Sequence, residues 1–191
     1  MKKTAIRFFI FLALLVNFTS SGLSAQDSSR LRISLLTCTP GDELYSIFGH
    51  SAIRITDSSN VGNDYFDIVY NYGTFNFDDE GFSLKFMRGK LLYFISIVKF
   101  DDFKFDYQST NRGMTDQVFN LTPTEKENIH FALKENLKEE NRYYQYDFFL
   151  DNCTTRLRDI IEKYKQPQPL FHPVMPANTR FRQAIHQYLD S

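Results

Sequence analysis

The sequence contains no tryptophan, only two cysteines and no long run of charges of one sign. Its 22 Lys and Arg residues nearly balance its 23 Asp and Glu residues, which gives a formal net charge of −1 at pH 7. Proteins that bind nucleic acid neutralise phosphates with basic patches, so this composition indicates that nucleic acid is not a partner. Two apolar runs, Phe8–Val16 and Leu91–Phe100, are both much shorter than the roughly 20 residues of a membrane-spanning helix.

Sequence motifs for metal and phosphate chemistry are missing too. There is no His-Glu-x-x-His motif, no cluster of His and Cys at ligand spacing and no glycine-rich phosphate loop, so we predict no zinc site and no cofactor. Gly49-His50-Ser51 is similar to the turn that carries a serine nucleophile, but Ile53 replaces the second glycine which that turn requires. The histidines away from this segment, His130, His172 and His186, are expected on the surface.

Aromatic residues, by contrast, are plentiful, with 20 Phe and 11 Tyr among 191 residues. The N-terminus has the three parts of a secretory signal peptide, namely a basic segment, an apolar segment and small residues: Lys2, Lys3 and Arg7, then Phe8–Val16, then Leu23-Ser24-Ala25. We therefore predict a signal peptide over residues 1–25, with an uncleaved anchor as the alternative. Residues 26–191 are then one periplasmic domain with a proline-rich C-terminal tail.

The hydrophobic patterns predict an α+β fold. Alternating and β-branched runs predict strands at Arg32–Thr37, His50–Thr56, Tyr65–Tyr72 and Leu91–Phe100, with further strands near Phe103, Phe105 and Tyr107 and at Gln117–Leu121. Capping residues and apolar stripes predict helices at Asp42–Phe48, at about Thr122–Lys138, Cys153–Lys165 and Thr179–Leu189. Residues 75–89 are expected to be irregular.

The second and third predicted strands form an antiparallel hairpin with a long polar connection. In such a hairpin, the start of the first strand lies beside the end of the second. We therefore expect His50 to lie next to Tyr70, Asn71 and Tyr72 at one edge of the sheet.

Cys153 is the candidate nucleophile. It follows Asp151-Asn152 and opens a predicted helix, where the helix dipole and free backbone N–H groups favour the thiolate. His50 is the candidate base, and Asn71 is the candidate group that orients its imidazole. The backbone N–H of Cys153 would stabilise an oxyanion together with a side-chain donor. The candidates for this auxiliary role are Asn152, Tyr146 and Tyr72.

A second interpretation stays open at this point. In an oxidising compartment, Cys38 and Cys153 could form a structural disulfide. The chain would then be a non-catalytic envelope domain that binds a ligand or a partner protein.

Four long segments carry a resemblance to a known family: Thr39–Arg54, Val69–Phe77, Gly89–Tyr93 and Tyr146–Arg156. They resemble the Lnb N-terminal periplasmic domain family of Bacteroidetes. More distantly, the layout is similar to the permuted papain-like (NlpC-type) proteins, including lecithin retinol acyltransferase-like enzymes, in which a histidine strand precedes a cysteine helix. The resemblance implies hydrolysis or transfer at an amide, ester or thioester of a cell-wall peptide or lipid acyl group.

The resemblance also implies that the domain is associated with a membrane. Members of the family often continue into a membrane-embedded C-terminal half, whereas this chain stops at Ser191. The expectation is therefore a stand-alone domain or a truncated copy, located near the membrane and served by a separate membrane-embedded partner.

Overall fold

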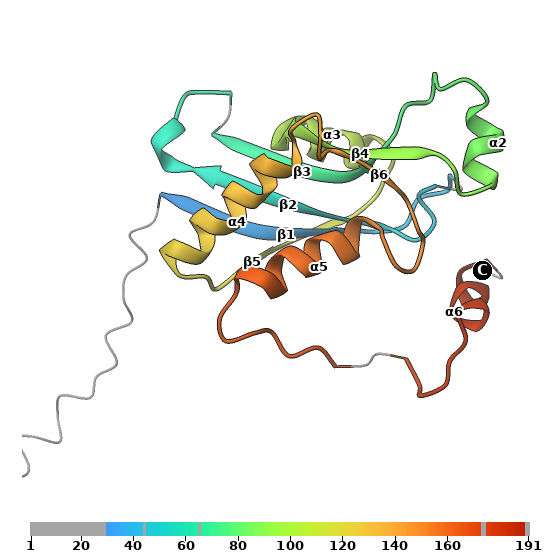
Figure 1. The fold of residues 1–191 in the computed structure, drawn as a ribbon. Coiled ribbons are helices and arrows are strands. Elements are labelled where there is room, and N and C mark those ends of the chain that lie inside the picture. Colours follow the sequence, from blue (N-terminus) through green and yellow to red (C-terminus); the bar gives the residue numbers. More distant parts are fainter. Residues whose placement is uncertain (1–29, 44, 65, 173–174, 190–191) are drawn as a thin grey trace, which may run out of the picture.

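The computed structural model describes residues 30–43, 45–64, 66–172 and 175–189. Its centre is a six-stranded antiparallel sheet in the order β5-β1-β2-β3-β4-β6 (Figure 1). The strands are β1 (Leu31–Cys38), β2 (His50–Asp57), β3 (Asp67–Thr74), β4 (Leu92–Lys99), β5 (Met114–Val118) and β6 (Tyr143–Gln145). With the helices described below, this sheet confirms the predicted α+β class.

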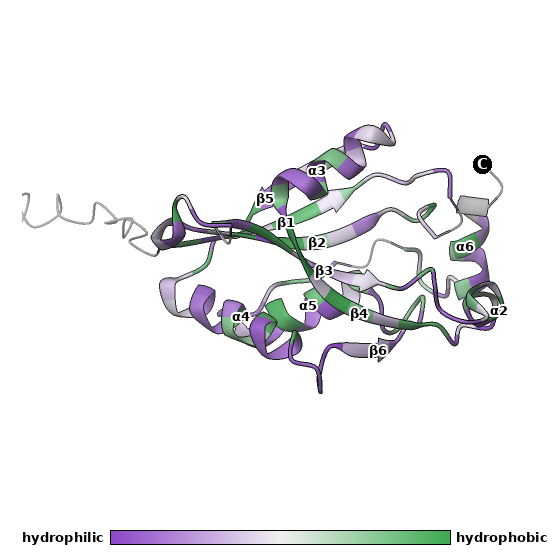
Figure 2. Ribbon diagram, turned by 90° about the horizontal axis from the view of Figure 1, so that it is seen from above, coloured by the Kyte–Doolittle hydropathy of each residue, from purple (hydrophilic) through white to green (hydrophobic). Residues whose placement is uncertain are grey.

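The helices cover both faces of the sheet. They are η1 (Ser58–Asn60), α2 (Phe82–Met87), α3 (Phe100–Ser109), α4 (Pro123–Asn136), α5 (Cys153–Tyr164) and α6 (Phe181–Leu189). Seen from above, α4 and α5 lie on one face and α3 lies on the other (Figure 2). In the part of the chain that the structure describes, no helix has both the length and the apolar character needed to cross a bilayer.

Each face of the sheet has its own buried core. The larger core joins the sheet to α4 and α5 through side chains that are almost fully buried, among them Ile33, Ile53, Tyr70, Ile95, Ile129, Leu133 and Leu157. The smaller core joins Leu36, Cys38, Ala52 and Val69 to Phe103 of α3. Burial of apolar surface on both faces fixes the register of the strands, because a one-residue slip would turn every side chain to the opposite face.

The β2–β3 pair opens at one end. Its ladder runs from Thr56↔Asp67 to Ile53↔Tyr70, so His50 to Ala52 lie beyond the last paired residues. On its other side, β3 shifts register against β4 between Asn71 and Thr74. Such irregularities bend a strand and redirect its side chains. The opening leaves room at this end of the sheet for the first turn of α5.

Several sequence predictions need correction. Phe103, Phe105 and Tyr107 lie in α3, not in strands. Residues 82–87, expected to be irregular, form α2.

Other elements differ in extent. The described residues of the expected helix Asp42–Phe48 form turns, and residue 44 lies outside the described residues. The expected strand at Gln117–Leu121 is shifted, because β5 ends at Val118. The predicted signal peptide, residues 1–25, lies entirely outside the described residues.

Candidate active site

Three segments bring Cys153, His50 and Asn71 together. His50 is the first residue of β2, Asn71 lies in β3 and Cys153 is the first residue of α5. The expected adjacency of His50 and Asn71 is confirmed, since His50 Nε2 lies 2.6 Å from Asn71 Oδ1. An amide oxygen can only accept, so Nε2 donates in this pair. This leaves Nδ1 as the imidazole nitrogen available to the thiol.

The surroundings of Cys153 favour its thiolate. Burial raises the pKa of the thiol, but the hydrogen bond and charge of His50 lower it, as do hydrogen bonds from the Ser51 backbone N–H and from the Thr154 side chain. The net result is a pKa of about 7, below the ordinary value of 9.0. A cysteine with such a pKa is about half ionised at neutral pH, which is the condition for a nucleophilic thiol.

A tight turn before α5 places Cys153. The Asp147 carboxylate accepts hydrogen bonds from the backbone N–H groups of Phe149 and Leu150, at 2.9 and 2.8 Å. The backbones of Asp147 and Asp151 exchange two hydrogen bonds, which close the turn. Asp151 also binds Arg156 through both of its carboxylate oxygens, at 2.6 and 2.7 Å. The turn is therefore tied to the helix that it precedes.

Asn152, a predicted oxyanion donor, is the N-cap of α5. Its Oδ1 accepts from the Thr155 backbone N–H at 2.9 Å, and its Nδ2 donates to the Phe148 carbonyl at 2.8 Å. The Oδ1 atom and one N–H of Nδ2 are thus engaged in holding the helix start. Tyr72 is also engaged away from the thiol, since its hydroxyl accepts a hydrogen bond from Asn136 of α4.

Tyr146, the remaining auxiliary candidate, does lie beside the thiol. It lines a cavity of about 120 Å³ together with Cys153, His50 and Gly73. Its ring stacks on Tyr93, with ring centroids 4.5 Å apart. The other walls of this cavity are mostly aromatic: Tyr45, Phe48, Phe75, Phe86, Tyr93 and Phe148. The abundance of Phe and Tyr thus serves in part to surround the candidate nucleophile.

Two residues that the sequence analysis did not single out also contact the thiol. They are Ser51, through its backbone N–H, and Thr154, whose Oγ1 lies 3.9 Å from Cys153 Sγ. Each is the next residue after a predicted site residue. The signal that could have found them is adjacency in sequence to His50 and Cys153.

Glycine at position 49 is required by space as well as by conformation. Gly49 has φ +75°, and a Cβ built there would lie 2.7 Å from the carbonyl oxygen of Cys38. Gly73 has φ +88°, and its missing side chain leaves His50 Cε1 and Cys153 Cβ facing a shared space. Gly49 therefore lets the chain before His50 pass close to Cys38, while a Cβ at Gly73 would lie at ordinary contact distance, 3.7 and 3.8 Å, from the two site residues.

The substitution Gly49→Ala is expected to lower the free energy of unfolding by about 2–4 kcal/mol, through left-handed strain and the clash with Cys38. Urea denaturation measures this change. Gly62→Ala is the matched control, because Gly62 has φ +83° but open space around the added Cβ. An equal loss of stability in the two variants would show that the approach to Cys38 does not constrain this position.

Cys38 is a free, buried thiol, and Cys153 is also free. Cys38 lies opposite His50 in the β1–β2 register. Burial raises the pKa of Cys38 to about 11, so its thiol is protonated at neutral pH. The structure therefore contains no disulfide between Cys38 and Cys153, and the two thiols have opposite ionisation preferences.

The remaining histidines lie elsewhere. His172 and His186 are exposed, as expected. His130 was expected on the surface but is half-buried in α4, where its ring packs edge-on against Tyr70 at 6.1 Å. Burial lowers its pKa. Among the described residues, no three His, Cys, Asp or Glu side chains form a group that could hold a metal ion.

A family model described as the Lnb N-terminal periplasmic domain matches residues 18–183, which is most of the chain. The chain belongs to the Lnb N-terminal periplasmic domain family. The family's description supports the expected periplasmic location. No curated protein and no solved structure matches the chain. In this Lnb domain, the grouping of Cys153, His50 and Asn71 is the feature that bears on activity.

Proposed function

We propose that this Lnb domain is a thiol-dependent hydrolase or acyltransferase that acts on an ester or amide bond of a cell-envelope substrate. The observation that carries the proposal is geometric: Cys153 at the start of α5 shares a cavity with His50, whose ring is held in turn by Asn71 at 2.6 Å. Nucleophile, base and orienting group are the three parts of covalent acyl-transfer catalysis.

In the first step, Nδ1 of His50 takes the proton of the Cys153 thiol, and the resulting thiolate attacks the carbonyl carbon of the substrate and forms a C–S bond. The carbonyl π electrons move to the oxygen, and the backbone N–H of Cys153 is placed to stabilise this charge, since first-turn N–H groups have no acceptor within the helix. When the intermediate collapses, the C–O or C–N bond breaks. The imidazolium of His50 gives its proton to the leaving group, and an acyl thioester remains on Cys153.

In the second step, water or another acceptor attacks the thioester carbonyl. His50 takes the proton of the attacking group, the C–S bond breaks and the thiolate of Cys153 is regenerated. Asn71 keeps the ring in one tautomer through both steps, so that the same nitrogen faces the thiol and the leaving group. No redox partner is needed, because electrons and protons balance within the cycle.

The order of elements agrees with a permuted papain-like arrangement. The histidine strand β2 precedes the cysteine helix α5, and the orienting amide comes from the neighbouring strand β3. We propose on this basis that the domain is related to the papain-like proteins. The candidate substrates are a cell-wall peptide and a lipid acyl group.

Thiol labelling at varied pH tests the proposal on the purified domain. The alkylation rate at Cys153, followed by mass spectrometry with iodoacetamide, is expected to rise with pH along a titration curve centred near pH 7. Below that pH the thiol is protonated and slow, and above it the thiolate predominates. Cys38, which is buried and has a pKa of about 11, is the internal control and is expected to stay unmodified. A midpoint for Cys153 near 9 would contradict the proposal.

A further inference from the structure

The start of β2 is paired with another strand on one side only. His50 lies opposite Cys38 in the β1–β2 ladder. The β2–β3 ladder ends at Ile53, so β3 does not pair with His50 or Ser51. Contacts between this part of β2 and the first turn of α5 therefore help to set the distance between the imidazole of His50 and the thiol of Cys153.

Two hydrogen bonds join the first turn of α5 to this part of β2. The Thr154 hydroxyl donates to Ser51 Oγ at 3.2 Å, and the Ser51 backbone N–H donates to the sulfur of Cys153. The hydroxyl pair connects residues 103 positions apart, and each of the two directly follows a residue of the site, His50 or Cys153. The Thr154 oxygen also lies 3.9 Å from Cys153 Sγ. The hydroxyl pair therefore links the strand that carries the base to the helix that carries the nucleophile.

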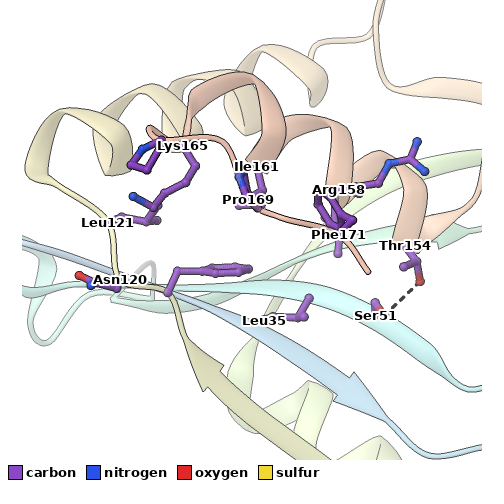
Figure 3. A pocket seen from close by; sticks show the side chains of 13 residues that line it. Leu35, Ser51, Asn120, Leu121, Thr154, Arg158, Ile161, Lys165, Pro169 and Phe171 are labelled. Carbon is purple, nitrogen blue, oxygen red and sulfur yellow. Dashed lines mark hydrogen bonds between the residues drawn. The ribbon is translucent and has the colours of Figure 1, made fainter. Parts of the chain in front are cut away.

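The two hydroxyls stand at one end of an apolar hollow along α5, which has a volume of about 410 Å³ (Figure 3). Leu35 and Phe119 line this hollow from the sheet side, Leu157 lines it from α5 and Phe171 from the proline-rich tail. The two cations in its lining are already paired, Arg158 with Asp159 at 2.6 Å and Lys165 with Glu125 at 3.5 Å. Such surroundings offer the Ser51 and Thr154 hydroxyls few competing partners, which favours the bond between them.

We propose that Ser51 and Thr154 are positioning residues, whose hydroxyl pair joins the start of α5 to the start of β2 and holds the Cys153 thiol within hydrogen-bond reach of His50. The inference rests on the proposed function and deepens it at the same site. The Ser51 side chain acts through Thr154, because the group of Ser51 that binds the sulfur is its backbone N–H. Ser51→Ala therefore removes the link and keeps that N–H in place.

The first test is the pH dependence of Cys153 alkylation by iodoacetamide in the variants Ser51→Ala and Thr154→Val. Loss of one hydrogen bond changes an equilibrium by about two- to tenfold, so we expect the midpoint to rise by about half a unit to one unit in each variant. At pH 7 the alkylation rate is then expected to fall by about two- to fivefold. Thr154 is exposed, so its replacement is expected to preserve folding.

Three further variants separate a link from two independent effects. Thr154→Ser keeps the hydroxyl and is expected to keep the midpoint of the parent protein. Thr124→Val is the matched control, because Thr124 is exposed and is the second residue of α4, as Thr154 is of α5. The double variant Ser51→Ala/Thr154→Val is expected to behave like Thr154→Val alone, since both changes remove the same bond. Additive shifts in the double variant would overturn the link.

Turnover of p-nitrophenyl acetate separates positioning from substrate binding. In Ser51→Ala, kcat is expected to fall by about tenfold through misplacement of the thiol, while KM stays within about twofold of the parent value. A Ser51→Ala variant with the alkylation midpoint and kcat of the parent would overturn the link and leave the proposed function intact. No turnover by the parent, together with a raised midpoint in Ser51→Ala, would support the link and overturn the proposed function.

Discussion

Replacement of Cys153 by Ala is expected to lower ester hydrolysis by the purified domain by at least ~10⁴-fold, because the covalent step has no other nucleophile in the proposed mechanism. The parent protein, rapidly quenched in acid after mixing with a p-nitrophenyl ester, is expected to carry one acyl group on the peptide that contains Cys153. Mass spectrometry of the digested protein detects this thioester, and the variant is expected to show none.

Cys38→Ala is the matched control for this experiment. Cys38 is the other cysteine of the chain, but it is 2% exposed and packs in the smaller core with Phe103. Its loss is expected to reduce stability modestly, through the removal of one buried sulfur, and to change turnover by less than about threefold. Loss of activity in the Cys38 variant equal to that in the Cys153 variant would point to a structural role for both thiols.

The neighbourhood of His50 and Asn71 was predictable from sequence because local patterns determine it. Alternation in β2 and β3 identifies both strands, and the connection between them, residues 58–66, is shorter than the crossover of about a dozen or more residues that a parallel pair needs. The start of α5 was predictable for a similar reason, since polar residues precede an apolar stripe at helical spacing. Both predictions use information within about ten residues of the site residue.

The missed helix α3 shows where such local reading fails. Phe103, Phe105 and Tyr107 alternate, which is typical of a strand. In the structure the effective spacing is that of a helix, with Phe103 and Tyr107 four residues apart and their ring centroids at 4.8 Å. Phe105 is 68% exposed, so it contributes nothing to the buried face. The sequence alone did not reveal which aromatic residues were buried.

The auxiliary residues were less predictable because they depend on competition between neighbours. The side-chain amide of Asn152 could donate a hydrogen bond to an oxyanion. In the structure, however, its Oδ1 accepts from the Thr155 N–H and its Nδ2 donates to the Phe148 carbonyl. The apolar hollow along α5 depends on still longer-range information. Its walls come from Leu35, Phe119, Leu157 and Phe171, and only the packing of the tail against α5 and the sheet brings them together.

Replacement of His50 by Ala is also expected to have a large effect, because the imidazole offsets the rise in pKa that burial causes at the Cys153 thiol. Burial raises the pKa of Cys153, while the hydrogen bond and charge of His50 are the main influences that lower it to about 7. Without the imidazole, burial is opposed by the Ser51 N–H, the Thr154 side chain and the helix start, so the pKa is expected to rise toward its ordinary value of 9.0. At pH 7 the thiolate fraction then falls from about one half toward ~1%.

Alkylation of Cys153 in the His50→Ala variant is therefore expected to slow by up to ~50-fold at pH 7 and to recover as the pH rises above 9, where the thiol ionises without help. Ester turnover is expected to fall further, by ~10³-fold, because the leaving group also loses its proton donor. His172→Ala is the control, since His172 is exposed and is not among the residues lining the cavity of Cys153. A His50 variant with the alkylation profile of the parent would mean that the thiol is activated by the helix start alone, and His50 would then have no part in forming the nucleophile.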